Sequence, residues 1–241
     1  YELWRANYSK AYFDLKTTLM PTANFNGIQL KSESRDNKGT VKYSLNGNKP
    51  VLYSKPVLIT KDQEIAVQYF QNNKVVNTQA FKISFNKATG KKVSITKTPN
   101  EKYPGQPGAF SLVNGIFSNK GLSYPDWLGW IGDDMEATID LGKTESFSTI
   151  RIHTLDQNGS WVYLPQYVEV LTSTDGKNFT AAGRSSDFVK DNLTMGWITI
   201  FLPLQQKPFI KVVAKNYGMI ADGKPGAGNK AWLFCDEIQV K

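Results

Sequence analysis

Cysteine and histidine are nearly absent from this sequence of 241 residues, which contains one of each. Cys235 alone cannot form an intrachain disulfide, and its apolar surroundings predict a buried side chain. A serine–histidine–aspartate triad or a zinc site would depend on His153, which lies in an alternating segment and is better explained as a structural or ligand-contacting residue. Long apolar runs are also missing, so we expect no membrane span, which needs about 20 consecutive apolar residues.

Arginine is scarce, although Lys and Arg together number 29 against 21 acidic residues and the formal net charge is +8. The excess is carried mostly by lysine, a hydrated point charge, whereas arginine is the residue that usually reads phosphate through paired hydrogen bonds. The basic residues form no dense block. We interpret this charge as a solubilising surface and expect no nucleic-acid partner; affinity for anionic polymers is the alternative.

The first part of the chain is predicted to be a small β-sandwich. Trp4, Tyr8 and Tyr12 have helical spacing and predict a short helical lead-in. Short alternating segments follow, separated by turns such as Asn46-Gly47, a favoured hairpin pair. The expected strands are 13–19, 28–31, 40–45, 51–59, 64–70 and 75–85. Strands at this spacing predict an immunoglobulin-like sandwich over residues 1–88.

The rest of the chain is also predicted to be all-β. The small and polar segment 86–92 is interpreted as a linker between the two domains. Turn signals then separate six strands, expected at 136–141, 148–155, 167–173, 197–203, 209–214 and 233–240. That number of strands suits a jelly roll over residues 89–241.

Several motifs resemble one family when taken in order. The hairpin Gly39–Pro50 resembles the Y-x-L-D-G-x-x-P hairpin of the sandwich that follows the catalytic barrel in bacterial β-N-acetylhexosaminidases. Further along come Glu136–Gly142, Trp161–Pro165, Ser173–Phe179 and Ala231–Ile238, which resemble a discoidin-like (coagulation factor V/VIII type C) module. The chain is similar to the C-terminal region of such a hexosaminidase: an immunoglobulin-like β-sandwich followed by a discoidin-like jelly roll.

This resemblance implies a non-catalytic, carbohydrate-binding accessory region. Its expected partners are glycans with terminal galactose or N-acetylhexosamine and the catalytic barrel of the parent glycoside hydrolase. It also implies export to the periplasm or the cell surface of a bacterium. Because Tyr1 opens a mixed polar and aromatic stretch without a signal peptide, we expect a mature fragment of a longer polypeptide. The alternative is that both domains are structural, pack on the barrel or on a partner, and bind no sugar.

Enzymatic activity is not expected of this chain alone. Hydrolysis of a glycoside needs an acid and a second group held across a cleft. The acidic residues Asp133, Asp134 and Glu136 lie in a turn that enters a strand, where a solvated turn explains them. A catalytic barrel of about 250 residues would not fit beside the expected strands.

The candidate sugar-binding residues are aromatic and amide side chains in loops. Sugar rings present apolar C–H faces, which flat aromatic side chains match. The candidates are Trp127, Asp156, Trp161, Tyr163, Asn216 and Tyr217; the resemblance implies that Asn216 contacts sugar hydroxyls. The alternative for each aromatic residue is a place in the core or at the domain interface. Gly223 and Lys224 stand where related modules often have a Trp-His pair, so a stacking aromatic is missing there.

The resemblance further implies a structural calcium ion between an early loop and the last strand. Asn114 and Glu237 stand at the corresponding positions. Calcium prefers several oxygen ligands with net negative charge, and asparagine in place of aspartate removes one charge. The alternative is that Asn114 makes a turn and Glu237 makes a surface ion pair.

Overall fold

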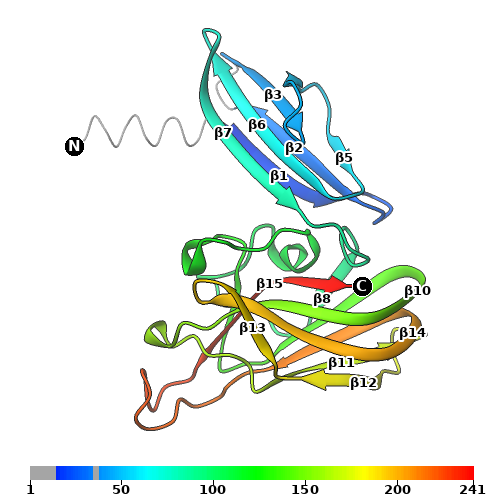
Figure 1. Ribbon diagram of the computed structural model, residues 1–241, viewed down its shortest axis with the longest axis vertical. Coiled ribbons are helices and arrows are strands. Elements are labelled where there is room, and N and C mark those ends of the chain that lie inside the picture. The colour runs from blue at the N-terminus through cyan, green and yellow to red at the C-terminus, as the bar shows by residue number, and fades with distance from the viewer. Residues whose placement is uncertain (1–14, 35–37) are drawn as a thin grey trace. The chain divides into compact units, whose positions relative to one another are not determined.

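The structure is a computed structural model that describes residues 15–34 and 38–241 (Figure 1). The helical lead-in expected at residues 1–12 lies outside the described residues. The chain divides into two compact units, Tyr1–Phe85 and Asn86–Lys241, which are described separately. Both units are built from antiparallel strands, so the all-β class is confirmed. Within the described residues, no helix combines the length and the apolar character needed to cross a bilayer.

Within residues 15–34 and 38–85, the first unit contains one sheet of three strands and one of four. The three-stranded sheet has the order β1-β2-β5 and the four-stranded sheet the order β4-β3-β6-β7. Their bounds are β1 Leu15–Pro21, β2 Ile28–Ser34, β3 Thr40–Leu45, β4 Val51–Leu52, β5 Val57–Ile59, β6 Gln63–Gln71 and β7 Lys74–Ile83. Alternating strand positions face the core, as in β6, where Ile65, Val67 and Tyr69 are buried.

The segment 51–59, expected as one strand, is two strands in different sheets. Pro56 supplies the break, since proline cannot donate to a strand ladder. β4 pairs with β3, and β5 pairs with β2. The turn signal before it is confirmed, because Asn46 and Gly47 have φ of 51° and 72°. Asn46 Oδ1 also accepts a hydrogen bond from Glu64 N at 2.9 Å.

The predicted linker 86–92 belongs to the second unit. Ala88 and Thr89 are almost fully buried there. Lys87 N donates to Val240 O at 3.1 Å, and Val240 N donates to Asn86 Oδ1 at 3.1 Å. Small polar residues indicate a linker in a sequence, but this segment hydrogen-bonds to the last strand and to Val113 O, so it is part of the fold.

The second unit contains an eight-stranded antiparallel sheet with the order β12-β11-β14-β10-β15-β9. β13 pairs with β14, and β8 pairs with β10. The bounds are β8 Lys92–Ile95, β9 Leu128–Ile131, β10 Met135–Leu155, β11 Tyr167–Ser173, β12 Thr180–Ser185, β13 Phe188–Asn192, β14 Met195–Lys215 and β15 Trp232–Val240. Three short 3₁₀ segments lie in the loops: η1 Gly108–Val113, η2 Gly121–Ser123 and η3 Asn158–Ser160.

Two long strands organise this sheet. The expected strands 136–141 and 148–155 are halves of β10, and 197–203 and 209–214 are halves of β14. β10 and β14 pair along their length, with register shifts between Asp140 and Glu145 and between Phe147 and Thr149. Such irregularities bend strands without ending them. Alternate residues of β10 face the core, including Met135, Ile139 and Ile152.

Candidate functional site

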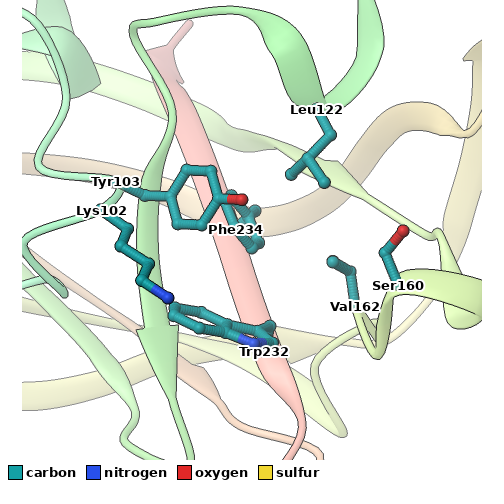
Figure 2. A pocket seen from close by; sticks show the side chains of 7 residues that line it. All are labelled: Lys102, Tyr103, Leu122, Ser160, Val162, Trp232 and Phe234. Carbon is teal, nitrogen blue, oxygen red and sulfur yellow. The ribbon is translucent and has the colours of Figure 1, made fainter. Parts of the chain in front are cut away.

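A concave site in the second unit is lined mainly by aromatic and aliphatic side chains. It encloses about 190 Å³, and we call it the aromatic pocket. Figure 2 shows its lining: Lys102, Tyr103, Leu122, Ser160, Val162, Trp232 and Phe234. These residues come from the segment before η1, from η2, from the end of η3, and from β15.

Strand β15 supplies the aromatic wall and floor. Trp232 and Phe234 are two positions apart, so they share one face of the strand. Phe234 is fully buried, whereas Trp232 is only partly buried. Their ring centroids are 5.8 Å apart, and Tyr103 meets both edge-on, at 5.5 Å from Trp232 and 4.7 Å from Phe234. Edge-to-face contacts at these distances hold aromatic rings in fixed orientations.

Backbone hydrogen bonds fix the opposite side of the aromatic pocket against β15. Trp232 N donates to Trp161 O at 2.9 Å, and Tyr163 N donates to Trp232 O at 3.0 Å. Ser160 and Val162 flank Trp161 and are thereby held beside the Trp232 ring. Ser160 is exposed at the rim, while Val162 is buried.

Gly129 allows the floor to pack closely. A Cβ atom there would lie 3.0 Å from both Phe234 and Tyr103, tighter than ordinary contact. Gly129 N donates to Tyr103 O at 3.0 Å, which ties the Tyr103 backbone to β9. Any side chain at position 129 would therefore require Tyr103 or Phe234 to shift by a few tenths of an ångström.

Trp127, expected as a sugar platform, is instead a core residue. Its side chain is fully buried, and Nε1 donates to Gly121 O at 2.8 Å. Its ring stacks on His153 at 5.5 Å with 12° between the planes. His153 is itself buried, with Nδ1 2.7 Å from Asp236 Oδ1. A ring enclosed in this way has no face for a ligand, so the expectation for Trp127 was wrong.

Asn216, the residue carried over by resemblance, organises the loop after β14. It is 2% exposed. Nδ2 donates to Asp133 O at 3.1 Å and to Ala231 O at 3.3 Å, which uses both amide hydrogens. Oδ1 accepts from Gly218 N at 2.8 Å. Because these bonds are internal to the protein, the structure assigns Asn216 to loop structure and not to a sugar contact.

Tyr163 and Tyr217 lie together, but a lysine of the same chain covers them. Their ring centroids are 4.7 Å apart. Lys224 Nζ lies 4.9 Å from the Tyr217 centroid and 5.8 Å from that of Tyr163, and it donates to Tyr217 Oη at 2.8 Å. This hydrogen bond raises the pKa of Lys224. Tyr163 Oη donates to Pro225 O at 2.9 Å. The two rings thus contact the loop that carries Lys224.

Trp161 and Asp156 lie next to the aromatic pocket without lining it. Trp161 is 39% exposed and has a φ of 63°, in the left-handed region. Its indole packs on Gly226, where a Cβ would approach within 2.5 Å. Asp156 Oδ1 accepts from Asn158 Nδ2 at 2.6 Å and so fixes the start of η3. Both residues shape the loop that presents Ser160.

The expected calcium ligands are close to one another but face hydrogen-bond donors. Glu237 is buried; Oε2 accepts from Gly115 N at 3.1 Å and Oε1 from Asn86 Nδ2 at 3.3 Å. Asn114 Oδ1 accepts from Ile116 N at 2.7 Å, and Nδ2 donates to Asp126 Oδ2 at 3.4 Å. No group of three or more His, Cys, Asp or Glu residues that could hold a metal occurs in the described part of the chain.

Burial raises the pKa of two carboxyl groups at this place, those of Asp126 and Glu237. Desolvation, followed by repulsion from Asp236, raises the pKa of Asp126 to about 6. The same two causes, in the same order, raise the pKa of Glu237. Oxygens that already accept N–H hydrogen bonds offer a calcium ion fewer ligand positions. The calcium site therefore stays a prediction of the resemblance.

No sequence pattern predicted the aromatic pocket. The alternation of Trp232 and Phe234 on the last strand is a signal for a shared face. Nothing in the sequence connects those two residues with Tyr103 or Leu122, which lie more than a hundred positions earlier. The pocket exists only because the loops before β9 and after β10 meet at β15.

The solved structures to which this chain is similar include carbohydrate-binding modules. No family model matches the sequence, and no curated protein does. Among solved structures, chitosan-binding module 1 of a chitosanase/glucanase from Paenibacillus sp. IK-5 is 13% identical, with a TM-score of 0.42, over 65% of this chain and 98% of that one. The lectin domain of lectinolysin, in complex with Lewis b antigen, is 20% identical, with a TM-score of 0.44, over 66% and 97%.

A third structure of this kind comes from Clostridium perfringens. The module CpGH89CBM32-5, in complex with GalNAc-β-1,3-galactose, is 16% identical, with a TM-score of 0.41, over 62% of this chain and 93% of that one. At these identities and TM-scores, the likenesses do not decide what this chain binds. The chemistry of the aromatic pocket is the better guide to what this chain binds.

Proposed function

We propose that this chain is a non-catalytic carbohydrate-binding region and that the aromatic pocket holds one sugar ring. The observation that carries the proposal is the pocket's composition: partly exposed aromatic rings form its wall, and polar groups stand at its rim. The apolar C–H face of a sugar packs on aromatic rings, while its hydroxyl groups need polar partners at the edge.

The size of the aromatic pocket suits a single ring. About 190 Å³ is less than the roughly 300–1,000 Å³ of pockets that enclose drug-sized ligands. A site that encloses one ring and leaves the rest of a glycan in solvent favours chain ends or single side branches. We expect weak binding, with dissociation constants on the order of micromolar to millimolar.

The wider assignment rests on the motif order described above. We propose that the first unit is immunoglobulin-like, that the second is discoidin-like, and that both serve an exported bacterial β-hexosaminidase-like enzyme. A weak module tethered to a catalytic barrel raises the local concentration of the barrel on its glycan. The purified chain should then release no product from a chromogenic N-acetylhexosaminide, and detectable hydrolysis would overturn the non-catalytic assignment.

A glycan array followed by isothermal titration tests the sugar site. Ser160→Trp places an indole at the rim of the aromatic pocket without disturbing a buried residue, because Ser160 is exposed. Ser186→Trp, between β12 and β13, is the matched control at another exposed serine. We expect the natural chain and Ser186→Trp to bind the same glycans and Ser160→Trp to bind none. A blank array from a folded natural chain would favour the structural alternative instead.

A further inference from the structure

We infer that the aromatic pocket prefers a sugar ring that carries a carboxylate or a sulfate group. This inference rests on the proposed function and names the class of ring that the pocket selects. It follows from which hydrogen-bonding groups line the aromatic pocket and which do not.

The lining is rich in donors and poor in acceptors. Lysine and tryptophan side chains donate only, and serine and tyrosine hydroxyls both donate and accept. Ser160 Oγ already accepts a hydrogen bond from Gln157 Nε2 at 2.8 Å, which uses one of its two acceptor positions and leaves its hydroxyl hydrogen available to donate. No aspartate, glutamate, asparagine, glutamine or histidine is among the seven lining residues.

This inventory matches an anion better than a neutral sugar. Each hydroxyl of a neutral sugar is a donor as well as an acceptor, and its donated hydrogen would need an acceptor, which the lining side chains provide only at the hydroxyls of Ser160 and Tyr103. A carboxylate or a sulfate only accepts, and hydrogen bonds to charged groups are shorter and stronger than those between neutral groups. The aromatic side chains meanwhile pack on the sugar ring that carries the carboxylate or the sulfate.

Lys102 supplies the positive charge. Its side chain extends toward the Trp232 ring at one side of the aromatic pocket (Figure 2). It forms no ion pair within residues 15–34 and 38–241. No lining residue is acidic, so the charge of Lys102 is not neutralised inside the site. An exposed cation beside a half-enclosed site attracts an anionic ligand most strongly at low ionic strength.

The test compares matched pairs of sugars by isothermal titration. The probes are galactose with galactose 6-sulfate, N-acetylglucosamine with its 6-sulfate, and methyl glucoside with methyl glucuronide. The sulfated and uronate arms separate the two sources of negative charge. At about 20 mM salt we expect the charged member of at least one pair to bind about tenfold more tightly, which corresponds to about 1.4 kcal/mol. Raising the salt to about 0.5 M should shrink that ratio, because screening weakens exposed charge pairs.

Lys102→Gln is the decisive variant, since it removes the charge and keeps a long polar side chain. Lys177→Gln, in the exposed turn between β11 and β12, removes the same net charge elsewhere. Lys102→Gln should bring both members of each pair to equal affinity, and Lys177→Gln should keep the difference.

The outcomes separate this inference from the proposed function. Equal affinity of charged and neutral sugars for the natural chain, with binding abolished by Ser160→Trp, would overturn the charge preference alone. A preference that survives in Lys102→Gln would overturn the role of Lys102. An absence of binding by every sugar would overturn the proposed function and this inference with it.

Discussion

Replacing Trp127 with alanine tests whether this residue is core or ligand platform. The side chain is fully buried, stacks on His153 and donates to Gly121 O, so its loss leaves a large cavity and removes one hydrogen bond. Substitutions of this kind cost about 3–5 kcal/mol. Small domains are stable by only about 5–15 kcal/mol, so the variant should be close to the limit of folding.

Urea unfolding measures this cost. Five of the six tryptophans lie in the second unit, so tryptophan fluorescence follows mainly its transition. With a slope of about 1–3 kcal/mol/M, Trp127→Ala should lower the urea midpoint by at least about 1 M. Trp161→Ala is the control, because that indole is 39% exposed and its loss should cost about 1 kcal/mol or less. A Trp127→Ala protein with the natural midpoint and impaired glycan binding would refute the core assignment.

Three further predictions concern the loop residues and the buried carboxyl groups. Asn216→Ala should cost about 1–3 kcal/mol by leaving Asp133 O and Ala231 O without their donor, seen as a lower melting temperature; an unchanged value would contradict the loop role. The pKa of Asp126 is raised to about 6 from an unfolded value near 3.8, so the folded state binds the extra proton, and stability should fall as the pH rises from about 4 to about 7. Asp126→Asn should remove that part of the pH dependence in thermal melts, and an identical pH profile would argue against the raised pKa. A calcium chelator should leave the melting temperature unchanged, whereas a drop of several degrees, restored by calcium, would establish the metal near Glu237.

Strand periodicity predicted much of the fold. The strand 167–173 coincides with β11, and 40–45 coincides with β3, because alternation there is regular and turn residues bound both ends. The long strands β10 and β14 were each divided in two. Gly142 lies between the two expected strands 136–141 and 148–155, but β10 passes it through a register shift and continues. A bulge and a turn use the same residue types, so only the pairing partner distinguishes them.

The candidate site was harder to predict, for a reason that Trp127 and Asn216 share. A tryptophan in a polar loop and an asparagine after a strand are equally suited to a ligand and to the protein's own backbone. Which of the two they meet depends on other segments: η2 and His153 for Trp127, and the turns before β10 and β15 for Asn216. The aromatic pocket likewise draws on four separate segments, so no local pattern indicates it.

The most direct test of the account follows the tryptophan indole N–H signals by NMR while a bound sugar is titrated. The aromatic pocket predicts that the Trp232 signal shifts and saturates with the sugar concentration, and that the buried Trp127 and Trp130 signals stay in place. Saturable shifts at Trp161 with none at Trp232 would place the site at the loop that packs on Gly226. That result would contradict the claim that the aromatic pocket holds the sugar.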